Sequence, residues 1–402
     1  MTKGSIPSRR FGRTEIQIPV LSLGGMRFQQ SWTDLGIKDI PISNQVNLEK
    51  ILHEAVNNGL HHLETARHYG TSELQIGLSI SNVNDPKRIL QTKVPPRDDP
   101  KDFEQELELS FKRLQCKRVD LLAIHGINLP EHLEQTIRPG GCIDIVRRWQ
   151  KKGLIGHVGF STHGSNDLIV QAIETNEFDY VNLHWYFIYQ DNSPALDAAA
   201  KLDLGVFIIS PTDKGGHLHT PSSKLVELCA PLHPIAFNDL FCLTDKRVHT
   251  ISVGAANPGN FERHIEALRL LNNSGELLST IQERLLDASR SSLGDEWLST
   301  WRVGLPRWDQ TPGGINIPVL LWLHTLIESW EMEDFAKSRY RLLGKASHWF
   351  PGSNADCFDD DVSEDDLREV LLESPWCDEI PFLLRQLKTR LAGEPSQRLS
   401  SI

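Results

Sequence analysis

The chain reads Ile89-Leu-Gln-Thr-Lys-Val94 and, after one amphipathic stretch, Val119-Asp-Leu-Leu-Ala-Ile-His125. Both runs are short and mainly apolar, and they contain residues that favour strands. The stretch between them places Phe103, Leu107, Phe111 and Leu114 at helical spacing. A strand, a helix and a second strand in this order predict a βαβ unit, in which the two strands are parallel.

The same alternation continues from Val20 to about Leu271. Eight short apolar runs carry it: Val20–Gly25, His61–Thr65, Ile89–Val94, Val119–His125, Ile155–Ser161, Tyr180–Tyr186, Gly205–Ser210 and Thr250–Gly254. Eight such units close into a barrel, so the sequence predicts an α/β fold of the (β/α)8 TIM barrel type. A doubly wound parallel sheet is the alternative, and it is disfavoured because the usual Gly-x-Gly-x-x-Gly after the first strand is missing.

The segments around this repeat define the expected domains. Arg10 to Pro19 predicts a small hairpin that plugs the N-terminal face of the barrel, and residues 237–248 predict a helical insertion before the last strand. We expect the barrel over residues 8–275 and a mainly helical C-terminal extension over residues 276–402. Within the extension we expect an irregular segment at 293–314, helices at 317–330, 363–372 and 383–391, and a frayed end from 397.

Composition limits the possible partners. The chain has 402 residues, with 42 Lys or Arg against 53 Asp or Glu, and a net charge of −11. From Ser291 to Ile402 there are 11 basic and 19 acidic residues, and seven of the ten Trp. An acidic, tryptophan-rich tail argues against nucleic acid and against an anionic membrane as partners, and it predicts a packed segment rather than a disordered one.

Targeting and redox signals point to the cytoplasm. The first ten residues lack the apolar core of a signal peptide, and no run of about 18 apolar residues is present. The six Cys are scattered and never form a Cys-x-x-Cys pair, which is typical of reduced thiols. We therefore expect a soluble cytoplasmic protein with no membrane span.

Polar residues lie where three neighbouring predicted strands end. Glu64 ends one run with Tyr69 shortly after it, Lys93 stands near the end of the next, and His125 ends the third. Barrels carry their chemistry at this rim. A Lys⁺ stabilises a phenolate and so lowers the phenol pKa, a carboxylate holds the Lys charged, and a His orients a carbonyl oxygen or relays a proton. Together these groups suit carbonyl reduction.

Several motifs follow one another in a fixed order: Arg10-Phe-Gly-Arg-Thr14, Leu21-Ser-Leu-Gly-Gly-Met26, Glu64-Thr-Ala-x-x-Tyr-Gly-x-Ser-Glu73, Thr92-Lys93, Asp120-Leu-Leu-x-x-His125 and Gly159-Phe-Ser161. Together they resemble the aldo-keto reductase superfamily over about residues 8 to 275. The resemblance implies a (β/α)8 barrel that reduces small-molecule aldehydes or ketones. It also implies a nicotinamide cofactor, usually NADPH with NADH possible, bound without a Rossmann motif.

The resemblance also implies catalytic roles. Tyr69 is the expected general acid, Lys93 lowers its pKa, and His125 orients the carbonyl or relays the proton. Glu64 stands where the family has Asp. Its extra methylene shifts the geometry of the pair with Lys93, so weakened or specialised activity is expected.

The expected cofactor contacts come from the resemblance too: Ser161, Thr162, Asn182, Ser210, Lys214, Gly254 and Arg263. The first three would hold the carboxamide, and Ser210 and Lys214 would lie near the pyrophosphate. Arg263 would replace the basic residue that the family has soon after the last strand, where this chain has Ala255-Ala256-Asn257.

The tail resembles a ferredoxin-like extension. Thr311-Pro-Gly-Gly-Ile-Asn-Ile-Pro318 is similar to the segment that follows the last cluster cysteine in one branch of the superfamily. Here the cysteine positions hold other residues, and Cys357 alone lies near the second set. Clusters need thiolate ligands. We expect a degenerate extension without an iron–sulfur cluster, and the histidines show no spacing of a metal site.

Two alternatives remain open. The first is a catalytically weak or inactive barrel that acts as a nucleotide-binding regulatory or scaffold protein. The second concerns Asp356–Asp366, which holds seven acidic residues in eleven. This run is either a solvated loop or a surface for a basic protein partner.

Overall fold

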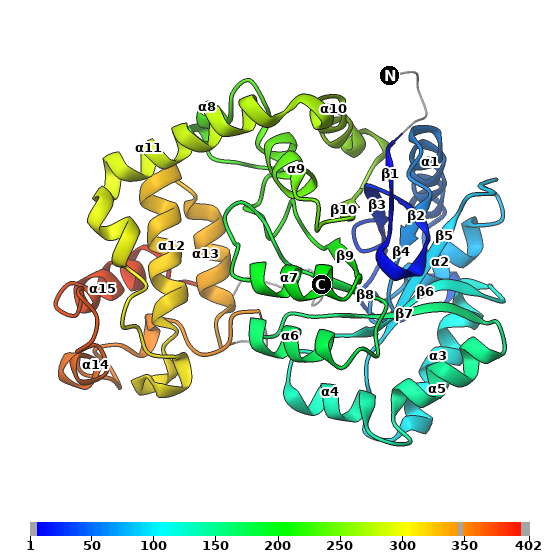
Figure 1. Ribbon diagram of the computed structural model, residues 1–402, viewed down its shortest axis with the longest axis horizontal. Coiled ribbons are helices and arrows are strands. Elements are labelled where there is room, and N and C mark those ends of the chain that lie inside the picture. The colour runs from blue at the N-terminus through cyan, green and yellow to red at the C-terminus, as the bar shows by residue number, and fades with distance from the viewer. Residues whose placement is uncertain (1–5, 345–348, 395–402) are drawn as a thin grey trace. The chain divides into compact units, whose positions relative to one another are not determined.

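The computed structural model describes residues 6–344 and 349–394, and their secondary structure is drawn in Figure 1. These residues form two compact units. The barrel unit contains residues 6–215 and 235–273, and the helical unit contains 216–234, 274–344 and 349–394. Residues 216–234 lie inside the range 8–275 expected for the barrel. They belong to the helical unit because α8 (Ser223–Cys229) contacts α11 (Gly275–Thr300). The prediction divided the chain at one position, near residue 275, and so missed this contact.

The fraying expected from 397 lies outside the described residues.

Eight parallel strands close into a barrel in the order β10-β3-β4-β5-β6-β7-β8-β9. The predicted (β/α)8 TIM barrel is therefore confirmed. Four predicted runs match their strands residue for residue, and the other four strands are two or three residues shorter. The strands are β3 (Leu21–Gly24), β4 (His62–Glu64), β5 (Ile89–Val94), β6 (Val119–His125), β7 (Ile155–Ser161), β8 (Tyr180–Leu183), β9 (Gly205–Ile208) and β10 (Thr250–Gly254).

Helices alternate with these strands along the chain. In α3, for example, Phe103, Leu107 and Leu114 are buried on one face, and the Asp99 side chain caps the first turn by accepting a hydrogen bond from Lys101 N. The helices around the barrel are α1 (Ile42–Asn58), α2 (Ser72–Ser79), α3 (Pro100–Leu114), α4 (Pro130–Ile137), α5 (Cys142–Lys151), α6 (Asn166–Glu174), α7 (Ser193–Lys201), α9 (Pro234–Thr244) and α10 (Glu262–Leu270). Helix α9 covers most of the predicted insertion at 237–248.

The predicted N-terminal hairpin is present and packs into the barrel. Strands β1 (Ser8–Arg10) and β2 (Gln17–Pro19) pair antiparallel. Between them, the fully buried Phe11 lies 5.4 Å from the ring of Tyr180, the first residue of β8. A Cβ at Gly205, the first residue of β9, would lie 2.6 Å from the Phe11 ring, so glycine is required there. Phe11 therefore fills the barrel at the end where the strands begin.

The helical unit contains the extension. Its helix α12 (Ile317–Trp330) matches the prediction, and α14 (Glu364–Val370) and α15 (Ile380–Leu391) lie close to theirs. The expectation of an irregular segment at 293–314 is wrong for its first part, because α11 continues to Thr300 across a kink at Gly294, where φ is +79°. Glycine at 294 interrupts the helical pattern in the sequence. Trp297 lies beyond this glycine and is buried, and its packing stabilises the last turns of the helix. Helix α13 (Glu333–Leu342) was not predicted.

Tryptophans of the tail pack against one another. Trp297 lies edge-on to Trp376 at 5.1 Å and to His324 at 5.3 Å between ring centroids, and its Nε1 donates to Thr325 Oγ1 at 3.0 Å. In residues 6–344 and 349–394 no group of three or more His, Cys, Asp or Glu is placed to hold a metal ion. The ferredoxin-like relationship of this unit stays a prediction.

The acidic run pairs with cations of its own unit. Asp359 accepts from Arg385 at 2.7 Å and Asp360 accepts from Lys388 at 2.7 Å, so the loop is tied to α15. Asp356 accepts from the Tyr340 hydroxyl at 2.7 Å. A basic protein partner for this run stays a prediction.

Ser363 starts α14 with a reciprocal cap. Asp366 N donates to Ser363 Oγ at 3.2 Å, and Ser363 N donates to Asp366 Oδ2 at 3.1 Å. Ser363→Ala should lower the free energy of unfolding of the helical unit by about 1 kcal/mol, because it removes the capping hydroxyl. Urea unfolding followed by circular dichroism measures this loss. Ser292→Ala in α11 is the control and should be neutral or slightly stabilising, since that serine caps nothing. Equal losses in both variants would contradict the assignment.

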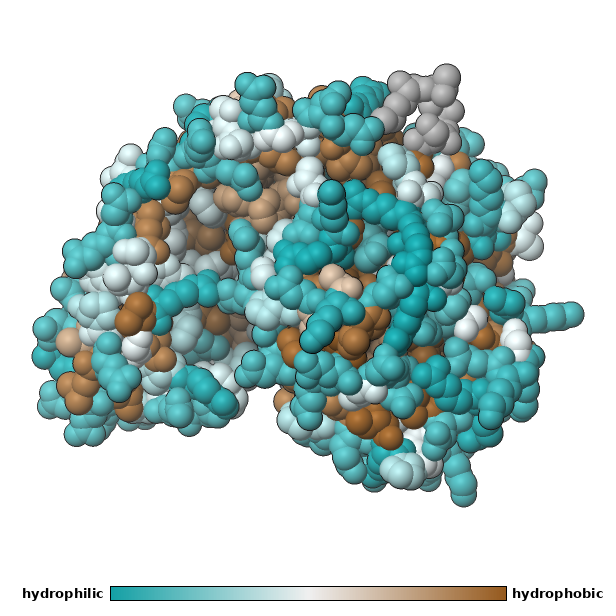
Figure 2. All heavy atoms as spheres, in the orientation of Figure 1, coloured by the Kyte–Doolittle hydropathy of each residue, from teal (hydrophilic) through white to brown (hydrophobic). Residues whose placement is uncertain are grey.

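The face of the molecule in Figure 2 carries mostly hydrophilic residues, with hydrophobic residues in small groups. Among the large apolar side chains of residues 6–344 and 349–394, Ile42 and Leu372 are the most exposed, at 82% and 77%. None of the helices in the described part of the chain combines the length and the apolar character needed to cross a bilayer.

Candidate active site

The barrel brings the four predicted catalytic residues together at the end where the strands finish. Glu64 ends β4, Lys93 stands one residue before the end of β5, and His125 ends β6. Lys93 Nζ forms an ion pair with the Glu64 carboxylate and lies 3.2 Å from Tyr69 Oη. The His125 ring meets the Tyr69 ring edge-on, with 5.7 Å between centroids.

Burial controls the charge states of this group. Lys93 is 1% exposed and Glu64 is 3% exposed. From the sequence, Lys93 is expected to lower the Tyr69 pKa, but burial raises the pKa of this phenol above its ordinary value, so the phenol keeps its proton at neutral pH. Burial lowers the pKa of the Lys93 ammonium well below its ordinary value, while the Glu64 carboxylate in contact with it favours the charged form.

His125 is held neutral. Burial is the main cause that lowers its pKa well below the ordinary value, and the nearby Lys93 and His68 add to this. Its Nδ1 is buried, and no hydrogen-bond partner for it is found among the described residues. A neutral imidazole with an open nitrogen beside a phenol can orient a carbonyl oxygen or pass on a proton.

A tight loop after β4 presents Tyr69. Tyr69 N donates to Ala66 O at 3.0 Å, and Ser72 N donates to Tyr69 O at 3.0 Å. Gly70 has φ +53°, and a Cβ there would lie 1.9 Å from Ser31 O. Only glycine fits this close approach of two backbone segments.

Of the residues predicted to hold a carboxamide, Ser161 ends β7, Thr162 follows it, and Asn182 stands one residue before the end of β8. Ser161 pairs in register with Asn182, and Ser161 Oγ accepts from Gly126 N at 3.1 Å. Asn182 is fully buried, and neither its Oδ1 nor its Nδ2 has a hydrogen-bond partner in the described part of the chain. A buried amide with both groups unsatisfied fits a ligand that offers one carbonyl and one NH₂. Thr162 differs, because its hydroxyl already donates to Ile127 O at 2.7 Å.

Lys214 lies in a cluster that the sequence did not predict. Its Nζ is 3.2 Å from His163 Nδ1 and 3.1 Å from His184 Nε2. His184 Nδ1 lies 2.6 Å from Tyr186 Oη, which donates to Ile209 O. Since the hydroxyl proton goes to the carbonyl, His184 carries its proton on Nδ1 and accepts from Lys214 at Nε2. Their positions in the sequence could have indicated this cluster, because His163 stands two residues after Ser161 and His184 stands two residues after Asn182.

The last predicted contacts have different surroundings. Ser210 adopts a left-handed backbone with φ +54° just after β9. Arg263 on α10 has a side chain that is 56% exposed, and it pairs with Glu266 at 3.5 Å. Gly254 ends β10, and a Cβ there would lie 2.8 Å from Arg27 Cδ. Glycine at 254 therefore leaves room for the stem of Arg27.

Arg27 was missed by the sequence analysis. It follows β3, whose Gly24 pairs in register with Gly254, and its side-chain stem lies beside Gly254 at the same rim. Among residues 6–344 and 349–394 the Arg27 guanidinium makes no ion pair or hydrogen bond. The signal was again position, since Arg27 directly follows the quoted motif that ends at Met26.

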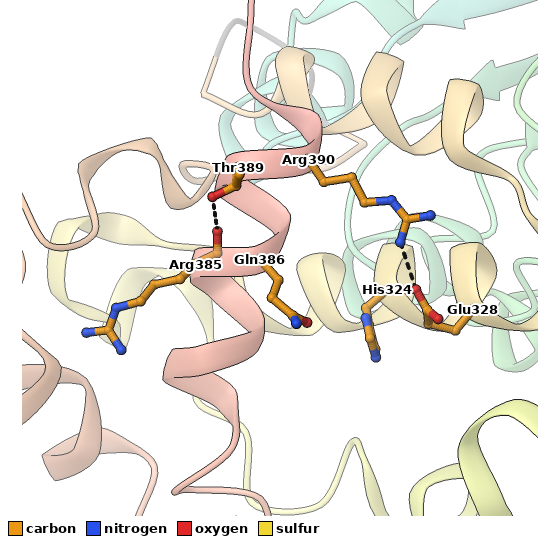
Figure 3. A pocket seen from close by; sticks show the side chains of 6 residues that line it. All are labelled: His324, Glu328, Arg385, Gln386, Thr389 and Arg390. Carbon is orange, nitrogen blue, oxygen red and sulfur yellow. Dashed lines mark hydrogen bonds and ion pairs between the residues drawn. The ribbon is translucent and has the colours of Figure 1, made fainter.

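A cavity of about 520 Å³ lies in the helical unit between α12 and α15 (Figure 3). Arg390 turns toward Glu328 and pairs with it at 2.8 Å, and it also pairs with Glu333 at 2.8 Å. Arg385 points the other way and pairs with Asp359. The cations of this cavity are thus neutralised within the unit, and we assign it no ligand.

The fold and the rim define a (β/α)8 barrel with a Tyr, Lys, His and carboxylate site. Residues 20–220 match the model of the aldo/keto reductase family. The match covers half of the chain, and the chain belongs to this family of oxidoreductases. The family inferred from the motifs is confirmed.

The curated relative YrpG of Bacillus subtilis, described as an uncharacterized oxidoreductase, is 25% identical over 232 residues. That match covers 51% of this chain and 66% of YrpG.

Solved structures support the fold. An aldo-keto reductase from Bacillus halodurans aligns with TM-score 0.58 and 16% identity over 70% of this chain and 96% of its own. One from Klebsiella pneumoniae in complex with NADPH aligns with TM-score 0.55 and 18% identity over 70% and 95%. A putative aldo-keto reductase from Pseudomonas aeruginosa has TM-score 0.52 and 19% identity over 69% and 98%.

Proposed function

We propose that this protein reduces an aldehyde or ketone to an alcohol with NADPH as the preferred cofactor and Tyr69 as the general acid. The observation that carries the proposal is the contact of 3.2 Å between Lys93 Nζ and Tyr69 Oη, made by a lysine that is also paired with buried Glu64. NAD(P)H supplies a hydride to the carbonyl carbon when bound. The side chains at the rim would donate the proton, stabilise the phenolate and orient the carbonyl.

Tyr69 donates its proton to the carbonyl oxygen as negative charge develops there, which completes the alcohol. The phenolate left behind is stabilised by Lys93, which also donates to Thr65 O at 2.9 Å and is therefore fixed in place. His125 orients the carbonyl oxygen beside Tyr69. Tyr69 then regains a proton from solvent, and the site returns to its starting state.

Glu64 in place of the family's Asp is compatible with this chemistry. Its longer side chain reaches the Lys93 ammonium, so the carboxylate that keeps the lysine charged is retained. Glu64→Asp tests whether the extra methylene limits the rate, because a shift of about 1 Å costs on the order of 10²-fold.

The residues at the rim fit a nicotinamide cofactor. The unsatisfied amide of Asn182 and the hydroxyl of Ser161 would hold the carboxamide, and Lys214 would lie near the phosphates. We propose further cofactor contacts at Ser210, Gly254 and Arg263. We add Arg27, because its side chain lies beside Gly254.

A second candidate is a nucleotide-binding regulatory or scaffold protein without turnover. It is favoured by Glu64, which stands where the family has Asp, and by Ala255-Ala256-Asn257, which stand where the family has a basic residue. Titration of NADPH and NADH against tryptophan fluorescence, followed by assays on a panel of aldehydes and ketones, separates the candidates. Binding with turnover supports the reductase, binding alone supports the second candidate, and the absence of binding contradicts both.

Arg27→Met should weaken NADPH binding about 10- to 100-fold, because a hydrogen bond to a charged group contributes about 1.5–3 kcal/mol. The methionine keeps the apolar stem that packs over Gly254. Fluorescence titration at low and high salt measures the loss, which should shrink as salt rises. Arg263→Met is the matched comparison and should have the smaller effect, since Arg263 is exposed and paired with Glu266. The reverse ranking would show that Arg263 is the anchor.

A further inference from the structure

Arg67 stands two residues before Tyr69 and is 6% exposed. Its backbone N–H donates to Lys93 O at 2.8 Å. The peptide next to the Tyr69 turn is therefore bonded to the strand residue whose side chain contacts Tyr69. The backbone of Arg67 alone therefore links the Tyr69 loop to the strand that carries Lys93.

The guanidinium of Arg67 joins two carboxylates from separate segments. One is Glu73 Oε2 in α2 at 2.5 Å, and the other is Asp34 in the segment 26–41. Glu73 is fully buried and also accepts from Thr92 Oγ1 at 2.6 Å. Arg113 adds a second cation on Asp34 at 2.7 Å. Two cations and two anions balance in this cluster, which we call the Arg67 cluster.

The segment 26–41 is bonded to the Tyr69 loop as well. Thr71 N donates to Ser31 O at 3.0 Å, and Gln30 N donates to Thr71 Oγ1 at 3.0 Å. These bonds place the Trp32 ring edge-on to Tyr69, with 6.2 Å between centroids. The two loops are therefore bonded to each other at the rim, and the buried Arg67 side chain lies between them.

Arginine suits this place better than lysine. A planar guanidinium offers donors in two directions at once, whereas an ammonium is a single point of charge. Burial raises the pKa of Glu73, and Arg67 is the largest of the groups that oppose this shift. Without Arg67, the buried carboxylate would lose its main support and would tend to take up a proton.

We propose that Arg67 is a positioning residue, which fixes the Tyr69 hydroxyl against Lys93 and holds Trp32 beside it by bridging Glu73 to Asp34. The proposal rests on the proposed reductase function for its kinetic consequence. Its structural consequence, the joining of residues 65–75 to residues 26–41, is independent of that function.

The test compares Arg67→Met, Arg67→Lys and Asp34→Asn with the wild-type chain by hydrogen–deuterium exchange and by kinetics. Arg67→Met should raise exchange in both segments and lower kcat about 10²-fold, with the KM for NADPH nearly unchanged. The upper limb of its pH–rate profile should move to lower pH, because a loosened loop admits water and the Tyr69 pKa falls toward its ordinary value. Arg67→Lys should restore exchange protection in 65–75 only, and Asp34→Asn should loosen 26–41 only.

Asp85→Asn is the matched control. The Asp85 side chain is 3% exposed and pairs at 2.9 Å with His61, which directly precedes the start of β4, at the opposite end of that strand from Glu64. It should cost stability without changing kcat or exchange in the two segments. Unchanged exchange in Arg67→Met overturns the proposal, as does an equal loss of kcat in Asp85→Asn. A wild-type chain without turnover would remove the proposed function, and the exchange results alone would then decide the role of Arg67.

Discussion

Tyr69→Phe should lower the rate of carbonyl reduction by about 10²- to 10⁴-fold, the range that a positioned general acid contributes. The ring stays against His125 and Trp32, and only the hydroxyl that meets Lys93 is lost. NADPH affinity should therefore remain close to that of the wild-type chain. Stopped-flow single-turnover measurements separate the chemical step from binding.

Tyr180→Phe is the control for that experiment. Tyr180 is fully buried, and its hydroxyl has no hydrogen-bond partner among the described residues. It begins β8, at the end of the barrel filled by Phe11. Removing this hydroxyl should leave turnover unchanged. Reduction that persists in Tyr69→Phe would assign the proton to another group.

Lys93→Met should abolish reduction and lower the free energy of unfolding of the barrel unit by about 3–5 kcal/mol, because buried Glu64 loses its partner. The pKa of the unpaired Glu64 then rises above its unfolded value. A carboxyl with a raised folded pKa costs stability once the pH exceeds its unfolded pKa, so the deficit should grow as the pH rises from about 4. Denaturant unfolding at several pH values measures this dependence.

A second substitution separates stability from catalysis. Lys93→Met combined with Glu64→Gln removes the unpaired charge, so most of the lost stability should return. Reduction should stay absent, because Tyr69 still lacks its cation. Recovery of turnover in the double variant would contradict the role of Lys93.

The barrel could be predicted because its signals are local. Strands such as β6 end at a polar residue after an apolar run, and the alternation of strand and helix repeats eight times. Once the barrel is assumed, strand ends meet at one rim, and Glu64, Lys93 and His125 follow from position alone. Tyr69 needed the motif, since a loop residue has no periodicity.

The missed contacts join segments whose separation along the chain carries no pattern. Arg27 reaches Gly254, Arg67 reaches Asp34, and Lys214 reaches His163. Each depends on how a loop folds over its neighbour. The composition of the chain and the spacing of its residues do not determine how these loops fold.

The division of the chain between the two units has a consequence for synthesis. Residues 216–234 leave the ribosome before β10, yet Ser222 Oγ donates to Trp330 O, 108 residues further along. The helical unit cannot assemble until α11 and α12 have emerged, and by then the whole barrel sequence is already available. Contacts of such sequence separation slow folding. We therefore expect the barrel to form first during translation and the helical unit to be completed in a late, slow phase.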